Sequence, residues 1–336
     1  MLERDVLIVG AGPAGLAAAI ACQRRGLSCA VIEKGVLVNS IYRFPTNMVF
    51  FTTPELLEIG GLPLVSPFEK PTRLEALRYY RRVVDALKLP VRLGETVDRV
   101  EQAAGGLRAH STTAAGEPVE WRAKAAILAI GYYDHPNRLE VPGEDLPHVS
   151  HYYTEAHPCY RKRVAVVGGA NSAAEAALEL FRAGALVTLV HRKADMSEGI
   201  KYWVLPDIKN RIAEGSIAAW FGARVVEIRP GAVIVEPGPP GDPHWALPAP
   251  RESIPADAVF LLTGYHPDRD LLRRCGVAVE GANYLPVYDP DTLETNAPNV
   301  FLAGGVISDS YRHPIFIENG RHHGERIVEV IASRLR

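Results

Sequence analysis

The sequence has little that would suggest a membrane or a nucleic acid. No apolar run approaches the roughly 18 residues that a membrane-spanning helix needs. The 37 lysines and arginines nearly balance the 39 aspartates and glutamates, and the formal net charge of −2 gives no electrostatic attraction to nucleic acid or anionic lipid. Its first residues run directly into a strand pattern, so no signal peptide is expected. We therefore expect a cytoplasmic protein without nucleic-acid or membrane partners.

Cysteine is also scarce, and no two of the four cysteines have the CxxC spacing. This absence argues against a CxxC redox dithiol and against a zinc site built on cysteine pairs. Cys22 and Cys29 lie in apolar segments and are predicted to be small core residues. Cys159 lies in a proline-rich linker and is the one candidate for a reactive thiol, although an inert cysteine is the default interpretation.

The N-terminal segment contains every part of a dinucleotide-binding βαβ unit. An apolar strand, Val6–Val9, leads into Gly10-Ala11-Gly12-Pro13-Ala14-Gly15, where glycines allow a tight turn and close approach to a pyrophosphate. A helix predicted over residues 16–25 directs its N-terminal amides toward that group. The next strand ends at Glu33, whose carboxylate can accept hydrogen bonds from ribose hydroxyls and repels a 2′-phosphate. The unit predicts FAD or NAD rather than NADP.

A second unit of the same type ends in different chemistry. The strand Val164–Val167 is followed by Gly168-Gly169-Ala170-Asn171-Ser172-Ala173, and a helix is predicted over residues 171–183. The strand after this helix ends in His191-Arg192-Lys193 instead of an acid. Three potential cations suit the 2′-phosphate, which carries about −1.5 to −2 charges. This unit therefore predicts NADPH.

Two nucleotide units in 336 residues favour an α/β protein with two Rossmann-like domains of the three-layer ββα type. We expect the NADPH domain, 158–265, to be inserted into the FAD domain, 1–157 and 266–336. Further helices are predicted over 72–88 and 317–334, a meander over 91–101, 107–113 and 119–121, and a strand over 125–130.

The sequence resembles the bacillithiol-disulfide reductase family of pyridine nucleotide-disulfide oxidoreductases, which is related to the low-molecular-weight thioredoxin reductases. The segments that carry this resemblance extend over nearly the whole chain: Asn39–Thr46, Phe50–Thr53, Leu57–Gly60, His151–Tyr153, Gly199–Pro206 and Ile315–Arg321. In place of the CxxC pair of thioredoxin reductases, residues 151–154 read His-Tyr-Tyr-Thr.

The motifs and the resemblance together imply FAD and NADPH as cofactors, and we expect two groups of residues to contact them. The FAD group is Gly10, Gly12, Pro13, Ala14, Gly15, Glu33, Lys34, Tyr42, Pro45, Thr46, Val97, Gly131, Gly304 and Glu318. The NADPH group is Gly168, Gly169, Asn171, Ser172, His191, Arg192, Lys193 and Gly264.

No catalytic side chain can be assigned with certainty. Members of the resembling family have a cysteine close to the flavin inside the first glycine motif, and this chain has Ala14 there. Because disulfide exchange needs an attacking thiolate, turnover of bacillithiol disulfide is predicted to be slow or absent. The physiological acceptor is predicted to take electrons directly from the reduced flavin.

The resemblance implies an NADPH-dependent flavoprotein oxidoreductase that reduces a low-molecular-weight thiol disulfide such as bacillithiol disulfide. Two alternatives remain open: a ferredoxin- or flavodoxin-type NADP reductase or other electron-transfer flavoprotein, and a non-catalytic redox sensor that binds FAD and NADPH. The acceptor would be a small molecule or a small redox protein, and a homodimer or homotetramer is expected.

Several polar and aromatic residues have two plausible interpretations. Tyr202 and Trp203 either belong to a core or face a flavin cleft, and His322 and His323 are expected at the surface or in a dimer contact. Three further histidines lie near Cys159 without the repeated spacing of zinc ligands, so no metal is expected: His148, His151 and His157.

Overall fold

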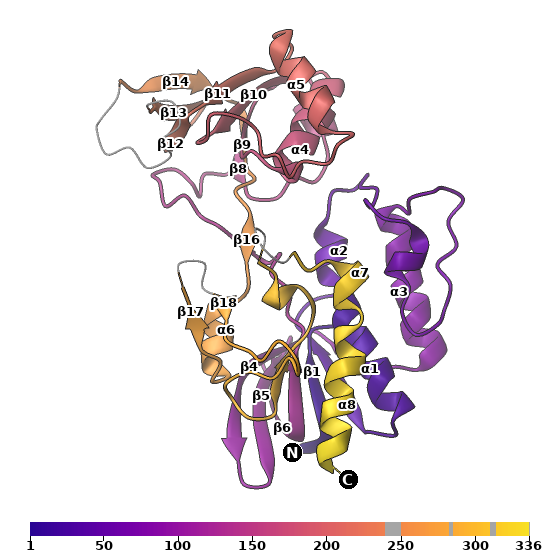
Figure 1. Ribbon diagram of the computed structural model, residues 1–336. Coiled ribbons are helices and arrows are strands. Elements are labelled where there is room, and N and C mark those ends of the chain that lie inside the picture. The colour runs from indigo at the N-terminus through magenta and orange to yellow at the C-terminus, as the bar shows by residue number, and fades with distance from the viewer. Residues whose placement is uncertain (239–249, 282–284, 310–313, 336) are drawn as a thin grey trace. The chain divides into compact units, whose positions relative to one another are not determined.

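The computed structural model describes residues 1–238, 250–281, 285–309 and 314–335, and the chain forms two compact units (Figure 1). Unit 1 comprises Met1–His135 and Tyr265–Arg336, and unit 2 comprises Pro136–Gly264. Unit 2 is thus inserted into unit 1, as predicted, and the α/β fold class is confirmed. The first boundary lies 22 residues before the expected one (158 − 136), because β8 (Val149–Ser150) pairs with β15 (Ala258–Leu261) in the sheet of unit 2.

Unit 1 is built on a parallel sheet in the order β3–β2–β1–β6, with β19 on the other side of β6. These strands are β1 (Leu2–Val9), β2 (Cys29–Glu33), β3 (Val91–Leu93), β6 (Pro118–Leu128) and β19 (Val300–Leu302). The first half of β6 also pairs antiparallel with β5 (Gly106–Thr113), which pairs with β4 (Glu95–Ala103).

This arrangement differs from the predicted strands in two places. Residues 119–121 and 125–130 were expected to form two strands, but β6 is continuous because no turn residue interrupts it, and it ends at Leu128. Val91–Leu93 joins the parallel sheet beside β2 instead of the meander.

Helix α1 (Pro13–Arg24) contributes the buried small residues Ala17, Ala18, Ala19 and Ala21 to the core of unit 1. The other helical elements of this unit are α2 (Asn39–Arg43), η1 (Pro54–Leu57), α3 (Arg73–Leu87), α6 (Arg269–Arg274), η3 (Gly304–Ile307), α7 (Ile317–Gly320) and α8 (His323–Leu335). Its remaining short strands are β16 (Tyr265–His266), β17 (Val279–Glu280) and β18 (Leu285–Pro286). Strand β16 pairs with β7 (His135–Pro136), and these two strands lie where the chain passes from one unit to the other.

The C-terminal helix is broken, although one helix was predicted over 317–334. α7 ends at Gly320, where a Cβ would lie 3.1 Å from the Cα of Gly304, and α8 begins at His323. In α8, a Cβ on Gly324 would lie 2.5 Å from the backbone nitrogen of Ala18, so α8 packs directly on the backbone of α1. Close glycine contacts therefore position this end of the chain.

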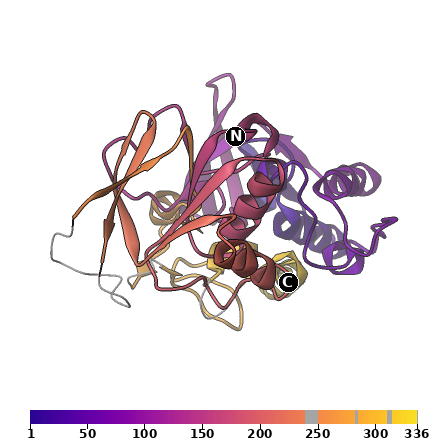
Figure 2. The same ribbon diagram turned by 90° about the horizontal axis from the view of Figure 1, so that it is seen from above.

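Unit 2 has three layers (Figure 2). Its parallel sheet has the order β11–β10–β9–β15–β8. Val164 and Val166 of β9 pack with the helices, whereas Ala165 and Val167 pack with the second sheet, because alternate strand residues point to opposite faces. The elements are β9 (Arg163–Val167), β10 (Leu186–His191), β11 (Ala218–Phe221), η2 (His157–Cys159), α4 (Asn171–Arg182), α5 (Leu205–Ala213), and the second sheet of β12 (Ala223–Arg229), β13 (Ala232–Pro237) and β14 (Glu252–Pro255).

Candidate cofactor-binding sites

The first glycine turn is closed on the protein side and open on the other. Gly10 follows β1 with φ = 104°, and a Cβ there would lie 2.5 Å from the carbonyl oxygen of Ala129. A Cβ on Gly15 would lie 2.0 Å from the Gly10 carbonyl oxygen, so α1 packs directly on the turn. At Gly12, which caps α1, a Cβ would meet no atom within 4 Å. This open space before the helix N-terminus fits a pyrophosphate.

Glu33 lies where β2 ends and is only 6% exposed. Its Oε2 accepts a hydrogen bond from the Ala11 N–H at 2.9 Å, and its Oε1 accepts one from the Gly35 N–H at 2.8 Å. Burial raises the pKa of this carboxyl above its ordinary value, and the two backbone donors oppose that shift. An ionised carboxylate has about four acceptor positions, so Glu33 retains capacity for ribose hydroxyls.

Ala14, Gly304 and His323 form a contact that the sequence did not indicate. Gly304 has φ = 74°, and a Cβ on it would lie 2.7 Å from the Ala14 Cβ. The Gly304 N–H donates a hydrogen bond to His323 Nδ1 at 3.1 Å. Burial, together with Arg326 and His322, lowers the pKa of His323 to about 4, so its ring is a neutral acceptor. His323 is thus partly buried and accepts a hydrogen bond within its own chain, while His322 is exposed; a dimer contact at either residue stays a prediction.

Asp134 is a second residue that sequence reasoning missed. It pairs with Lys34, whose Nζ lies 2.8 Å from Asp134 Oδ2, and with Arg43, whose Nη1 lies 3.4 Å from Oδ1. The only sequence signal was its place three residues after Gly131, which has φ = 64° beyond the end of β6. The ion pair with Asp134 thus holds Lys34 near the end of β6, and Gly131 lies in the segment that leads from β6 to Asp134. Both Lys34 and Gly131 were expected at the FAD site.

The other expected FAD residues are placed as follows. Pro13 is in the first turn of α1, Tyr42 is exposed on α2, and Val97 is buried on β4. Pro45 accepts a backbone bond from Met48 N–H in the loop that contains Thr46, and Glu318 is in α7. Among the described residues, no side-chain hydrogen bond ties Thr46 or Glu318 to the glycine turn.

The second glycine turn has a histidine lying on it. Gly168 has φ = 152°, and a Cβ there would lie 2.5 Å from the Leu262 carbonyl oxygen. A Cβ on Gly169 would lie 2.3 Å from two atoms of the His191 ring. Burial, reinforced by Lys193 and Arg192, lowers the pKa of His191 to about 4. His191 is therefore neutral at pH 7. Of the three cations expected here, only the exposed Arg192 and Lys193 carry a charge.

Asn171, the first residue of α4, holds a neighbouring loop. Its Nδ2 donates to the Gly199 carbonyl at 3.1 Å, and its Oδ1 accepts from the Lys201 N–H at 2.9 Å. Both ends of this amide are thus used within the protein, so Asn171 positions the loop beside the helix N-terminus. The other two expected NADPH residues are Ser172, which is exposed in α4, and Gly264, which has φ = 91° at the end of unit 2.

The loop held by Asn171 leads to an exposed aromatic pair. Tyr202 is 82% exposed and Trp203 40% exposed, with ring centroids 4.8 Å apart. The interpretation of these two residues as core aromatics is therefore wrong.

The cysteines do not resemble reactive thiols. All four are free and buried, and burial raises the pKa of the Cys159 thiol above its ordinary value. In the same segment, His151 Nε2 lies 3.2 Å from Glu144 Oε1. Within the described residues, no three histidine, cysteine or acidic side chains form a group that could hold a metal ion.

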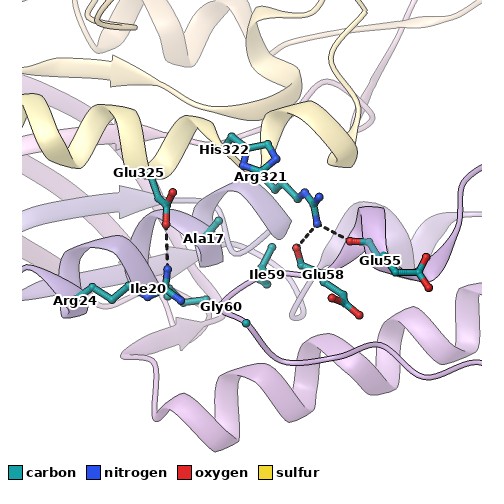
Figure 3. Close-up of a pocket in the computed structure, with 11 residues that line it drawn as sticks. Ala17, Ile20, Arg24, Glu55, Glu58, Ile59, Gly60, Arg321, His322 and Glu325 are labelled. Carbon is teal, nitrogen blue, oxygen red and sulfur yellow. Dashed lines mark hydrogen bonds and ion pairs between the residues drawn. The ribbon is translucent and has the colours of Figure 1, made fainter.

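A pocket of about 340 Å³ in unit 1 lies along the C-terminal half of α1 rather than at its N-terminus (Figure 3). Two arginines that line it already have partners. Arg24 pairs with Glu325 at 3.0 Å, and Arg321 donates to the carbonyls of Glu55 and Glu58 at 2.7 Å each. Gly12 is not among the residues that line this pocket, so the pocket is separate from the open space at Gly12.

Two dinucleotide folds in one chain, one ending in an acid and the other in two cations, define the class of two-cofactor pyridine-nucleotide oxidoreductases. The family model of the pyridine nucleotide-disulphide oxidoreductases matches residues 7–304. Bacilliredoxin reductase Bdr of Bacillus subtilis (strain 168) is 40% identical over 336 residues, with 99% of each chain covered. The solved structure of bacillithiol disulfide reductase Bdr (YpdA) from Bacillus cereus is 41% identical, has a TM-score of 0.93 and covers 99% of both chains. A ferredoxin–NADP reductase of Ignicoccus hospitalis is 27% identical over 317 residues, 90% of each chain.

The chain belongs to the pyridine nucleotide-disulphide oxidoreductase family and, within it, to the bacilliredoxin reductases. It is an enzyme that uses FAD and NADPH, and the resemblance read from the sequence is confirmed. No helix in the described part of the chain is long and apolar enough to cross a membrane.

Proposed function

We propose that unit 1 binds FAD, that unit 2 binds NADPH, and that the enzyme reduces a low-molecular-weight thiol disulfide. Bacillithiol disulfide is the first candidate, since the B. cereus relative is named for it. The balanced reaction is NADPH + H⁺ + RSSR → NADP⁺ + 2 RSH. The observation that carries the cofactor assignment is the difference between Glu33 at the end of β2 and Arg192-Lys193 after β10.

The chain's own residues bind and orient the two cofactors. The open space at Gly12 and the free N-terminal amides of α1 receive the FAD pyrophosphate, and Glu33 receives the adenosine ribose. In unit 2, α4 receives the NADPH pyrophosphate and Arg192 the 2′-phosphate. When bound, FAD accepts two electrons from NADPH and passes them to the acceptor.

Gly12→Val tests the FAD assignment. Because a Cβ at this position meets no protein atom within 4 Å, the variant should fold, whereas the valine side chain would occupy the pyrophosphate space. We expect purified wild type to be yellow and the variant to be colourless, with similar circular dichroism. A variant that retains flavin absorbance would contradict the placement of the pyrophosphate.

The acceptor step has no obvious thiol to carry it. Ala14 replaces the flavin-proximal cysteine, and the four cysteines are buried. We therefore propose that electrons pass directly from the flavin to the disulfide, which breaks its S–S bond and takes up two protons.

Rapid mixing of the FAD-loaded enzyme with NADPH tests this function. We expect bleaching of the flavin absorbance, followed by recovery when bacillithiol disulfide is added under anaerobic conditions. Glutathione disulfide, a ferredoxin, a flavodoxin and a quinone form the comparison panel. Recovery with one of the others and not with bacillithiol disulfide would overturn the proposed acceptor while preserving the cofactor assignment.

The same panel of acceptors distinguishes the proposed disulfide reductase from the second candidate function, a ferredoxin- or flavodoxin-type NADP reductase. The distant likeness to a ferredoxin–NADP reductase and the lack of an accessible thiol favour it. A redox sensor would bind both cofactors and turn over none of these acceptors. A homodimer or homotetramer stays a prediction, which light scattering of the purified protein will test.

A further inference from the structure

Two of the four cysteines are in contact beneath the turn that joins α1 to β2. Cys22 lies in the last turn of α1 and is fully buried, and Cys29 is the first residue of β2 and is 5% exposed. The Cys22 thiol donates a hydrogen bond to the Cys29 sulfur. The Cys29 sulfur also lies 4.0 Å from the carbonyl oxygen of Ala19, one turn of α1 before Cys22. Residues 23–26 above the pair are exposed, so the two thiols lie just below the surface.

The backbone on both sides of the pair is held in place. The Cys22 carbonyl accepts a hydrogen bond from the Leu27 N–H at 3.0 Å. The N–H and the hydroxyl of Ser28 donate to Asp5 Oδ2 at 2.8 and 2.6 Å, and these bonds fix the start of β2 to β1. Formation of an S–S bond of about 2 Å between Cys22 and Cys29 therefore requires rotation of the two side chains and no movement of α1.

The pair differs chemically from a single buried thiol. Burial by itself raises the pKa of a thiol, because the thiolate loses its hydration. Here the hydrogen bond from Cys22, supported by the charge of Arg4, lowers the pKa of Cys29 against the effect of burial. The same hydrogen bond, together with burial, raises the pKa of Cys22. One cysteine thus supplies a thiolate and the other a second sulfur beside it, which is what thiol–disulfide exchange requires.

We propose that Cys22 and Cys29 form a redox-active dithiol that a low-molecular-weight disulfide oxidises to an intramolecular disulfide. The Cys29 thiolate attacks one sulfur of the disulfide RSSR and releases RS⁻, which takes up the proton lost from Cys29. Cys22 then loses its proton, attacks the Cys29 sulfur of the mixed disulfide and releases the second RSH. The sum is 2 Cys–SH + RSSR → Cys–S–S–Cys + 2 RSH, so RSSR takes up the two electrons that the protein thiols lose.

The new bond would cross-link α1 to β2 away from the expected FAD contacts. The glycine turn lies at the other end of α1, and Glu33 lies at the other end of β2. The disulfide is therefore a modification of the scaffold of unit 1 and not a step of the flavin reaction. Because it restricts the unfolded chain, its formation should stabilise the protein. The proposal goes beyond the proposed function and does not depend on which acceptor the flavin reduces.

Thiol mapping of the purified wild-type protein tests the proposal. The protein is incubated anaerobically with glutathione disulfide and without NADPH, the remaining thiols are alkylated in denaturant, and the peptides are identified by mass spectrometry. We expect Cys22 and Cys29 to be joined, while Cys159 and Cys275, which are also buried, stay free and serve as internal controls. Full alkylation of Cys22 and Cys29 would overturn the proposal, and so would loss of all four thiols at one rate, which would indicate unfolding. A protein purified without flavin would contradict the cofactor assignment and leave this measurement unaffected.

The stability of the oxidised protein gives a second measurement. Oxidation should raise the midpoint temperature of unfolding of the wild type by about 3–7 °C, and dithiothreitol should reverse the shift. Cys22→Ala should abolish the shift and leave Cys29 as a mixed disulfide with glutathione, whereas the matched control Cys275→Ala should retain the shift. A shift that persists in Cys22→Ala would overturn the assignment of the bond to this pair, and an unchanged midpoint in the wild type would contradict the stabilisation. Thiol mapping of the wild type keeps the test decisive if Cys22→Ala does not fold.

Discussion

At the scale of single residues, the side chains at the end of the second strand of each βαβ unit separate the two nucleotides. Glu33 accepts hydrogen bonds from the backbone N–H groups of Ala11 and Gly35, so its carboxylate is fixed at the end of β2. After β10, Arg192 and Lys193 are exposed, while His191 is partly buried against Gly169 and neutral. In the proposed assignment, discrimination for the 2′-phosphate therefore depends on Arg192 and Lys193.

Arg192→Ala should weaken NADPH binding by roughly 10- to 100-fold and leave NADH binding nearly unchanged, because a charge-assisted hydrogen bond contributes about 1.5–3 kcal/mol. The measurement is the dissociation constant of each nucleotide, determined by titration of the flavoprotein. Arg182→Ala is the matched control, since Arg182 is an exposed arginine of unit 2 that pairs with Asp207 on α5. Equal losses for NADPH and NADH would show that Arg192 does not contact the 2′-phosphate.

His323 makes the stability of the protein depend on pH. The pKa of a free histidine is about 6.5, whereas burial lowers that of His323 to about 4. As the pH falls below 6.5, the unfolded chain binds a proton that the folded protein does not, so this contribution to stability is present at high pH and is lost between about 6.5 and 4.

His323→Asn keeps an acceptor near the Gly304 N–H but does not titrate. Between pH 7 and pH 5 we expect the free energy of unfolding of the wild type to fall by about 1–2 kcal/mol more than that of the variant. Urea unfolding at both pH values measures the difference. Parallel pH dependence in the two proteins would contradict a His323 that stays neutral in the folded protein.

At the scale of elements, the C-terminal helix α8 is positioned by a glycine. A Cβ on Gly324 would lie 2.5 Å from the nitrogen and 2.6 Å from the Cα of Ala18, and neither backbone atom can move without moving α1. Gly324→Ala should therefore destabilise the protein by about 1–3 kcal/mol through overpacking. Thermal unfolding followed by circular dichroism measures this, with Glu329→Ala on the exposed side of α8 as the control, expected within about 0.5 kcal/mol of wild type. An unchanged midpoint temperature of unfolding for Gly324→Ala would show that α1 and α8 can move apart without loss of stability.

The same elements show which features a sequence can reveal. The glycine turns and the helices α1 and α4 were predictable, because each depends on residues adjacent in the chain. The break between α7 and α8 was not, because it accompanies a contact of Gly320 with Gly304, and neither was the neutral state of His191, because burial against Gly169 causes it. Likewise, a contact of Tyr132 with Gly305 joins segments more than 170 residues apart in the chain (305 − 132).

At the scale of the whole molecule, the insertion of unit 2 into unit 1 gives one chain two nucleotide-binding folds. The flavin has to exchange electrons with both NADPH and the acceptor, and a thiol beside the flavin could relay electrons to a disulfide. Here Ala14 takes that place, and the described cysteines are buried. The thiol-independent route that we propose can therefore be tested only on the whole chain.

We expect the enzyme reduced by NADPH to show no thiolate–flavin charge-transfer absorbance, because no thiolate lies at position 14. Cys159→Ala, and a variant with all four cysteines replaced by alanine, should retain NADPH oxidation with the physiological acceptor to within about threefold, apart from a loss of stability of about 1 kcal/mol per buried side chain. Stopped-flow spectra and steady-state rates with bacillithiol disulfide measure both. If activity with the disulfide is robust in wild type and disappears in Cys159→Ala while artificial acceptors are still reduced, then Cys159 is a catalytic thiol, its burial must be relieved during turnover, and direct transfer from the flavin is wrong. If activity survives without any cysteine, the disulfide is reduced at the flavin itself, and the replacement of the family's cysteine by Ala14 changes the route of the electrons without changing the reaction.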